Sequence, residues 1–108
     1  MTRLVQALRK RALRHPDTTE GIACEGTALE KRTVKVGSKA FLFLGLADAM
    51  FKLTDSAKEA TRLGLQVGKH GWVKVPFDSA PPLARLEKWV DESYRAVAGA
   101  KRTRSSHG

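Results

Sequence analysis

The sequence predicts an α+β domain in two layers, with an antiparallel sheet of about four strands and helices on one face. Residues 33–53 hold three short apolar stretches separated by turns, a pattern typical of a three-stranded antiparallel meander. Helical patterns with one apolar face lie near both ends of the chain. One further strand pattern precedes the last helix. The expected element order is therefore α-β-β-β-α-β-α, which is typical of an α+β fold.

The chain of 108 residues fits one domain, large enough to bury a core without a metal or a disulfide. We expect residues 1–99 to form this domain and residues 100–108 to be a basic, disordered tail. Cys24 is the only cysteine, so an internal disulfide is excluded and the reducing cytoplasm is the expected compartment. No stretch approaches the roughly 20 apolar residues of a membrane span, so no membrane association is expected.

The positive charge lies mainly at the two ends of the chain. The net charge is +9, of which residues 1–15 contribute +5 and residues 101–108 contribute +3. The 85 residues between them carry 12 basic and 11 acidic side chains. A strongly basic protein suggests a nucleic-acid partner, but basic chain ends are also common as solvated tails. The isoelectric point alone therefore leaves the partner open.

The apolar pattern of residues 2–15 predicts the first helix. Their apolar side chains recur at helical spacing and form one stripe, Leu4, Val5, Leu8 and Ala12. Pro16 disfavours helical geometry at His15 and ends the helix there. Residues 17–31 have no sustained period. For this segment a loop with a short helix around Thr19–Cys24 is favoured over a functional loop.

The meander begins with Val34 and Val36, which alternate with polar residues as in a half-buried strand. Gly37-Ser38 follows directly and favours a two-residue hairpin turn of type II′. Residues 40–44 are apolar on both faces, which predicts the most buried strand in the middle. After a turn over residues 45–48, residues 49–53 return as the third strand.

A short helix is expected next, because Ser56 and Glu59 have the spacing of a capping box. Gly64 suits the left-handed position that follows a helix end. Residues 72–75 alternate again as a strand, and Pro76 places this strand at an edge or ends it.

The last helix opens at residues 79–82, where proline is tolerated in the first turn, and Gly99 is expected to end it. Its apolar face holds Leu83, Leu86, Val90 and Val97, with Trp89 and Tyr94 beside it.

Nothing in the sequence indicates catalysis. His15, His70 and His107 are scattered, and no spacing of His, Cys, Asp or Glu is typical of a metal site. Residues 37–39 resemble the end of a phosphate-binding loop, but they open a strand pair and not a helix. Residues 68–71 match a Gly-x-x-Gly clamp for RNA, but a strand pattern follows them. We therefore expect a non-enzymatic protein without a cofactor or a metal.

The predicted sheet carries a group of basic side chains near a tryptophan. These residues are Lys35, Lys39, Lys52 and Lys74, with Trp72 on the same face as Lys74. Lysines on one sheet face can neutralise phosphates, while a tryptophan stacks on a base or sugar. Two other interpretations stay open: the lysines keep a solvated face soluble, or Trp72 is buried against the last helix.

Four short segments carry a resemblance to a known family. They are Gly37–Phe41, Met50–Leu53, Gly71–Val75 and Glu92–Tyr94. In their order and spacing, over about residues 15–98, they resemble the MmcQ/YjbR-like proteins. Residues 16–20 are similar to the Pro-Gly-x-x-Glu loop of that family, with Asp17 where glycine is usual.

The resemblance implies a small α+β fold of the frataxin-like (CyaY-like), double-wing type, whose members are described as DNA-binding. It also matches Lys39, Lys52, Trp72 and Tyr94 to residues that recur in the family, although Tyr94 can equally serve packing. We therefore expect a DNA-binding protein that contacts phosphates through sheet-face lysines. The alternative is a module that binds a protein partner or a small ligand and has incidentally basic termini.

Overall fold

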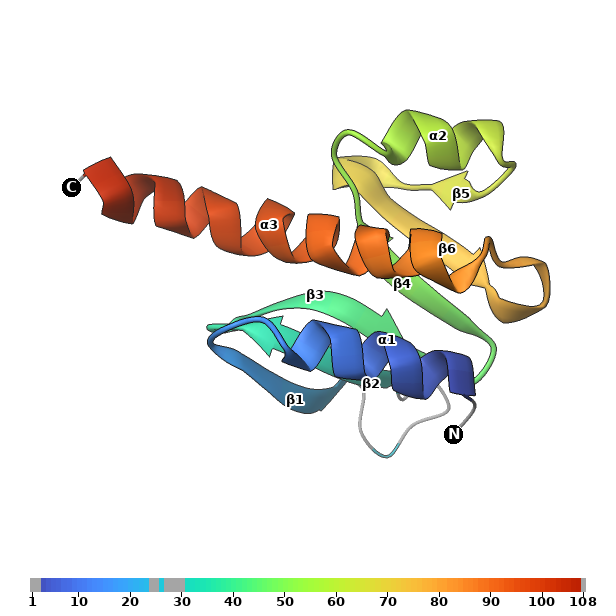
Figure 1. Ribbon diagram of the computed structural model, residues 1–108, viewed down its shortest axis with the longest axis horizontal. Helices are drawn as coiled ribbons and strands as arrows, with labels where there is room; N and C mark the ends of the chain where they lie inside the picture. Colours follow the sequence, from blue (N-terminus) through green and yellow to red (C-terminus); the bar gives the residue numbers. More distant parts are fainter. Residues whose placement is uncertain (1–2, 24–25, 27–30, 108) are drawn as a thin grey trace.

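A six-stranded antiparallel sheet forms the centre of the computed structural model, which describes residues 3–23, 26 and 31–107 (Figure 1). Along the chain the helices and strands are α1 (Arg3–Leu13), β1 (Thr18–Ala23), β2 (Lys31–Val36), β3 (Lys39–Leu44), β4 (Asp48–Lys52), α2 (Ala57–Arg62), β5 (Gln66–Val67), β6 (Trp72–Pro76) and α3 (Leu83–His107). The strand order in the sheet is β1-β2-β3-β4-β6-β5.

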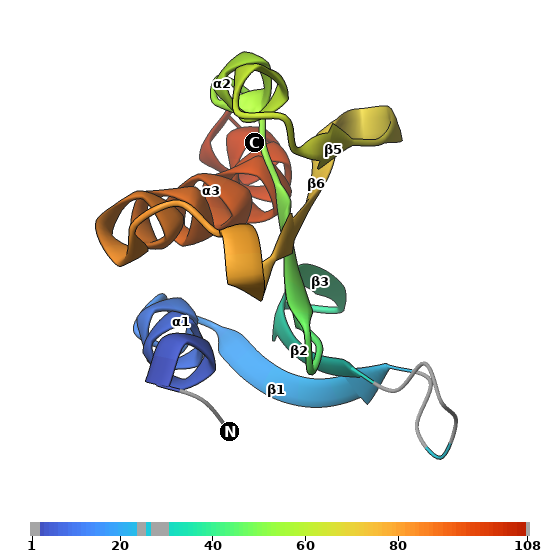
Figure 2. The same cartoon turned by 90° about the vertical axis from the view of Figure 1, so that its right-hand side faces the viewer.

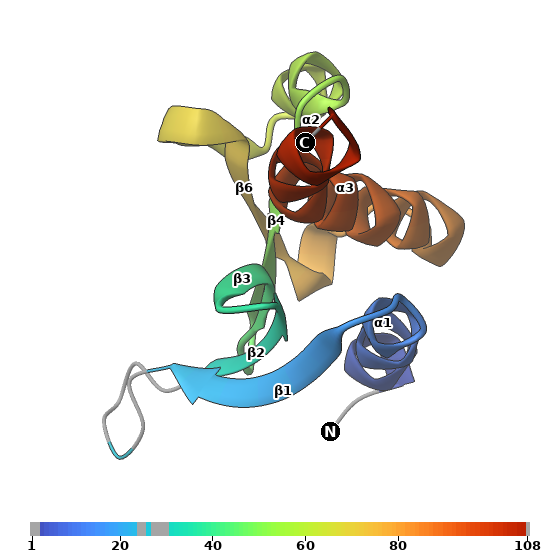
Figure 3. The ribbon, with the colours of Figure 1, turned by 90° about the vertical axis from the view of Figure 1, so that its left-hand side faces the viewer.

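The helices α1 and α3 pack on the same face of the sheet and against each other (Figures 2 and 3). The short helix α2 lies near β5, at one end of the sheet. No helix of the described chain covers the other face, which we call the open face. The predicted two-layer α+β class is therefore confirmed, with six strands in place of about four.

The core lies between the sheet and the two long helices. Its fully buried side chains come from both layers: Val34, Leu42, Phe51, Val73 and Val75 from the sheet, and Leu8, Leu86, Trp89 and Val90 from the helices. Trp89 packs edge-on against Phe51, with ring centroids 6.1 Å apart. The predicted meander is confirmed as β2, β3 and β4. Gly37 has φ 63° in the β2–β3 turn and Ser38 keeps a negative φ, which excludes a type I′ turn.

A β-bulge in β3 changes which of its side chains are buried. Val34 pairs with Leu42 but Lys35 pairs with Ala40, so Phe41 is one extra residue in β3. Phe41 and Leu42 are consecutive and both fully buried. The bulge therefore explains why this strand is apolar at successive positions.

Two strands were not expected. The segment that predicted a loop with a helix around Thr19–Cys24 forms β1, which pairs along its whole length with β2. The expectation was wrong because β1 carries no alternating apolar pattern that could predict a strand. It has one strand neighbour only, and its pairing with that neighbour, not its hydrophobicity, determines its strand conformation. The strand β5 has two residues, too few to leave any period in the sequence.

The start of α2 is stabilised by α3 and not by a capping box. Ser56 precedes the helix but makes no capping bond, because its Oγ donates to Glu92 Oε1 at 2.7 Å. The second oxygen of Glu92 accepts from the backbone N–H groups of Thr54 and Ser56, at 2.8 and 3.0 Å. Glu59 instead binds Arg85 at 2.9 Å. The predicted capping box is wrong, whereas the left-handed Gly64 after the helix, with φ 82°, is confirmed.

The helix α3 runs past Gly99 to His107, so the expectation that Gly99 ends it is wrong. Glycine inside a helix costs about 1 kcal/mol relative to alanine and does not by itself terminate it. The division into a domain of residues 1–99 and a tail of residues 100–108 stays a prediction.

Asp17 occupies the turn between α1 and β1 with φ 62°, in the left-handed region. Glycine adopts this conformation without steric cost, so Asp17→Gly is expected to raise the free energy of unfolding by about 0.5 to 1 kcal/mol. Urea denaturation measures this change. Asp17→Ala removes the same carboxylate but keeps Cβ, and it should give no gain. A gain of equal size in both variants would contradict the backbone explanation.

Candidate nucleic-acid interface

Strand register places a defined set of side chains on the open face. In the three central pairings, Phe43 lies opposite Met50, Met50 opposite Lys74, and Lys52 opposite Trp72. These residues alternate with the buried Phe51, Val73 and Val75, which face the helices. By the same register the open face also holds Thr19, Gly21, Lys31, Thr33, Lys35 and Asp48.

Two aromatic rings lie near the middle of the open face. Phe43 on β3 and Trp72 on β6 meet across β4, with ring centroids 5.3 Å apart and ring planes at 66°. Both side chains, like Met50 between their strands, are only partly buried. The open face therefore has an apolar centre that is partly accessible to solvent.

Lysines surround this aromatic pair. Lys35 and Lys52 form no ion pair with any residue that the structure describes. Lys74 Nζ lies 3.5 Å from Asp48 Oδ2, and Lys31 Nζ lies 3.4 Å from Asp48 Oδ1. Among the described residues, Asp48 is the one acid that the register places on this face. Four lysines thus share the open face with a single carboxylate.

The other described acids lie on the helices, in turns, or toward the helical layer. Glu20 on β1 accepts a hydrogen bond of 2.8 Å from Arg9 Nε on α1. Glu59, Glu87, Asp91 and Glu92 belong to α2 and α3. The fold therefore separates charges that are nearly balanced in the sequence between the two ends, and it leaves the open face basic.

Gly21, on the edge strand β1, leaves room for the side chain of Lys35 on the open face. A Cβ at this position would stand 3.0 Å from Thr33 Oγ1 and 3.5 Å from Lys35 Cε. The absence of a side chain lets the stem of Lys35 extend over β1. Thr33 is itself buried, and its hydroxyl finds no hydrogen-bond partner among the described residues.

The bulge at Phe41 separates Lys39 from the other lysines. Lys39 pairs with Val36, which lies two residues from the buried Val34 on the same side of β2. Register therefore assigns Lys39 to the helix-covered side, at the exposed β2–β3 turn. The structure brings Lys35, Lys52, Trp72 and Lys74 to one face but not Lys39. The sequence offers no signal for a bulge in an all-apolar strand, so simple alternation misplaced this residue.

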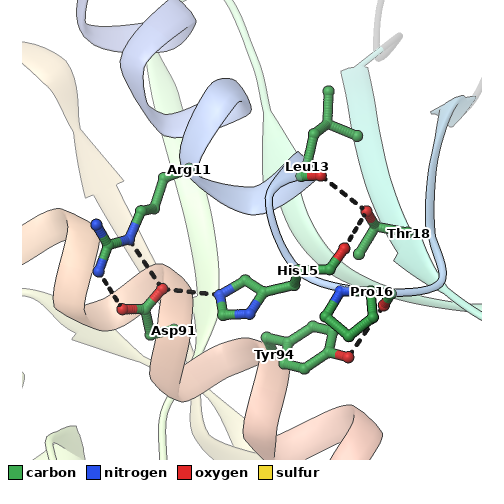
Figure 4. Close-up of polar contacts among 7 residues, drawn as sticks. All are labelled: Arg11, Leu13, His15, Pro16, Thr18, Asp91 and Tyr94. Atoms are coloured by element: carbon green, nitrogen blue, oxygen red, sulfur yellow. Dashed lines mark hydrogen bonds and ion pairs between the residues drawn. The ribbon is translucent and has the colours of Figure 1, made fainter.

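Trp72 and Tyr94 lie on opposite sides of the sheet. The interpretation that Trp72 is buried against the last helix is wrong, because Trp72 alternates with the buried Val73 and faces away from α3. Tyr94 is buried, and its hydroxyl donates to the carbonyl oxygen of Pro16 at 3.0 Å. Its ring stacks on the ring of His15, with centroids 4.2 Å apart (Figure 4). It also meets the ring of Phe41 edge-on, with centroids 5.3 Å apart. Tyr94 therefore serves packing.

An ion-pair cluster joins the end of α1 to α3, and sequence reasoning missed it. Arg11 donates two hydrogen bonds to the two oxygens of Asp91, and His15 Nε2 lies 2.8 Å from Asp91 Oδ1 (Figure 4). Burial of the Asp91 carboxyl opposes its ionisation, but the hydrogen bonds from Arg11 and His15 outweigh burial and lower its pKa. These residues are about 80 positions apart in sequence, so no spacing rule connects them.

A comparison with protein-family models decides the family. The model described as YjbR matches residues 13–96, which include every strand of the described chain and slightly more than half of α3. This chain belongs to the YjbR family. The resemblance stated from the sequence is therefore confirmed, and the open face lies wholly within the YjbR region. No curated protein and no solved structure shows a significant match to the chain.

The segment Glu92-Ser93-Tyr94, which carried part of the resemblance to the YjbR family, connects α3 to three other parts of the fold. Glu92 binds the start of α2, and Tyr94 binds the carbonyl of Pro16. Ser93 is fully buried: it accepts a hydrogen bond of 2.8 Å from the Lys52 N–H, and its hydroxyl donates to the carbonyl oxygen of Phe41. In this member of the YjbR family, the segment is therefore structural.

Glu92→Gln is expected to lower the free energy of unfolding at pH 7 by about 1 kcal/mol, the usual cost of losing a helix cap. Burial opposes ionisation of Glu92, but hydrogen bonds from Ser56 and Thr54 outweigh it and lower the pKa of Glu92 in the folded protein. The stability that Glu92 contributes is therefore present above about pH 4.3, the unfolded value, and is lost as the pH falls through the folded pKa.

Urea denaturation between about pH 3 and pH 7 tests this expectation, since Glu92→Gln should lose less stability on acidification than the wild type. Glu87→Gln is the matched control on the same helix, because no hydrogen bond or ion pair of Glu87 is seen among the described residues, and its charge acts only at longer range, on Arg11. Identical pH profiles for the two variants would contradict the capping role.

A second candidate region of this YjbR protein is a cavity of about 290 Å³ beside α2 and α3. It is lined by Ser56, Glu59, Arg85, Lys88, Trp89, Asp91, Glu92 and Arg95. Its acids already have partners, because Glu59 binds Arg85, Asp91 binds Arg11, and Glu92 binds Ser56. Within the described residues no three His, Cys, Asp or Glu side chains group as for a metal ion, and no helix there is long and apolar enough to cross a membrane.

Proposed function

We propose that this YjbR-family protein is a non-enzymatic, cytoplasmic DNA-binding protein that contacts phosphates through the lysines of its open face. The observation that supports this proposal most is the separation of charge by the fold. Among the described residues, four lysines and one aspartate share a sheet face that no described helix covers, although the chain between its basic ends is nearly neutral. Such a face attracts a polyanion, and binding releases the cations condensed on DNA.

The residues of the open face have different parts in this proposal. Lys35 and Lys52 can bind a phosphate without first breaking an ion pair, because no described acid pairs with them. Lys74 is held by Asp48 at 3.5 Å, a weak contact at an exposed ammonium group that a phosphate can replace. Trp72, directly opposite Lys52, supplies an apolar surface beside these charges. The basic residues near the two chain ends add attraction at longer range.

Salt dependence of binding tests the proposal. The full chain is titrated into a fluorescently labelled DNA duplex, and anisotropy gives the affinity at several salt concentrations. Phosphate contacts predict a linear fall of log affinity with log salt, with a slope of about 0.9 per phosphate neutralised. If neither the duplex nor its separate strands bind at about 50 mM salt with micromolar protein, the proposal is ruled out, because non-specific binding alone typically has a Kd of about 100 μM to 1 μM at higher salt.

The second candidate function is the binding of a small ligand or a protein partner, and the cavity beside α2 and α3 favours it. Lys88 and Arg95 line this cavity without an ion pair among the described residues, so an acidic ligand or an acidic peptide suits it best. An NMR titration separates the two functions. DNA should shift backbone resonances of β2, β4 and β6, whereas an acidic peptide should shift those of α2 and α3.

A further inference from the structure

We infer that the open face prefers single-stranded DNA to duplex DNA, with Trp72 as the surface on which an unpaired base stacks. This inference rests on the proposed DNA-binding function and specifies its substrate class. It begins with the position of Trp72. The ring is partly exposed, on a face that no helix of the described chain covers, and lysines lie on the strands around it.

The geometry of the aromatic pair leaves ring surface available. An edge-to-face contact uses the face of only one ring, so at least one of Phe43 and Trp72 keeps both faces clear of the other. Every base presents a π face, and stacking on an aromatic side chain tolerates any sequence. The centre of the open face therefore suits an unstacked base in a way that a purely lysine-rich surface does not.

The shape of the sheet opposes deep contact with a duplex. The major groove is about 12 Å wide and admits a helix or a two-stranded ribbon. The open face extends over several strands spaced about 4.8 Å apart, so it is too broad to enter that groove, and we expect it to meet a duplex at the phosphates. The faces of paired bases are stacked inside the duplex and cannot reach Trp72. A single strand can present both its bases and its phosphates to the open face.

The lysine positions suit a strand that stacks on Trp72. Lys52 is the cross-strand partner of Trp72, so their Cβ atoms lie about 5 Å apart. Lys74 is two residues further along β6, about 7 Å from Trp72 along the strand. Lys35, on β2, lies beyond Phe43 on the far side of the aromatic pair. Phosphates on either side of a base stacked at Trp72 would therefore have ammonium groups within reach.

A labelled 15-nucleotide single strand and its own duplex test this inference with the full chain at about 50 mM salt. Anisotropy should show the single strand binding about 10-fold more tightly or better. Trp72→Leu keeps an apolar side chain but removes the stacking surface. It should weaken single-strand binding by about 5- to 100-fold and change duplex binding by less than about 2-fold. Circular dichroism checks that this variant folds.

Tryptophan fluorescence of the wild type gives a second readout that needs no variant. Trp89 is 1% exposed in the core, so quenching on DNA binding should come from Trp72. The single strand should quench it and the duplex should not. The strand preference would be overturned if the duplex bound as tightly as the single strand. It would also be overturned if Trp72→Leu lost affinity equally for the single strand and the duplex. Either result would leave the phosphate-binding proposal intact. Binding of neither DNA would overturn both.

Discussion

Gly71→Ala is expected to lower the free energy of unfolding by more than about 3 kcal/mol. Gly71 has φ 83°, and a Cβ at this position would stand 2.1 Å from the carbonyl oxygen of Leu53. The two residues are also joined by a hydrogen bond of 2.8 Å from the Leu53 N–H to the Gly71 carbonyl. An added methyl group therefore forces the backbone after β4 away from the start of β6. Urea denaturation measures the loss.

Gly64→Ala is the matched control for this prediction. Gly64 has nearly the same backbone angle, φ 82°, but nothing lies within 4 Å of the position of its Cβ. Only the left-handed conformation opposes the alanine there, at a cost of about 1 kcal/mol. Equal losses in the two variants would show that the close approach to Leu53 contributes nothing.

Replacing Lys35, Lys52 and Lys74 together by glutamine is expected to weaken DNA binding by about 10- to 100-fold at about 50 mM salt. The three ammonium groups lie on one face, and each replacement removes one of the proposed phosphate contacts. Their hydrogen bonds and ion pairs contribute little to folding, because the one described ion pair among them is the 3.5 Å contact of Lys74 with Asp48. Anisotropy gives the affinity, and thermal denaturation should show a nearly unchanged Tm.

A variant with the same loss of charge elsewhere controls for this effect. Lys101, Arg102 and Arg104 lie near the end of the chain, outside the YjbR match. Replacing these three by glutamine removes the same three positive charges from the protein. This variant should keep most of the DNA affinity. Equal losses in both variants would mean that net charge alone, and not the open face, governs binding.

The parts of the fold that sequence predicted well are those whose signal is local. The Gly37-Ser38 turn needs a positive φ at its first position, and Gly64 needs one after α2; both follow from the residue type. Val73 and Val75 alternate with Trp72 and Lys74, so the two faces of β6 could be separated correctly, although the burial of Trp72 stayed open. Local backbone preference and two-residue alternation carry this information without any tertiary contact.

The parts that sequence missed depend on contacts between distant segments. The strand β1 has no apolar alternation and is fixed by its pairing with β2. Ser56 looked like a helix cap, but Glu92, 36 residues later, performs this role. The extra residue Phe41 reversed the face of Lys39 relative to simple alternation. Each of these features becomes visible only when two elements meet.

The candidate site was predictable in kind but not in detail. Lysines at alternate strand positions near Trp72 indicated a basic face, and three of the four lie there together. The contact between Phe43 and Trp72 could not be read from the sequence, because it crosses an intervening strand. The position of Asp48, the single described acid on this face, could not be read from the sequence either. It lies beside Lys31 and Lys74 because of the register of three strands.

The salt dependence of duplex binding by the two triple variants tests the central claim most directly. If the open-face lysines contact phosphates, the variant of Lys35, Lys52 and Lys74 should show a log–log slope smaller than that of the wild type by roughly 2.7, or about 0.9 per lost contact. The variant of Lys101, Arg102 and Arg104 should keep a slope close to that of the wild type. An unchanged slope in the open-face variant, with the reduction appearing in the other, would contradict the claim that the sheet face binds DNA.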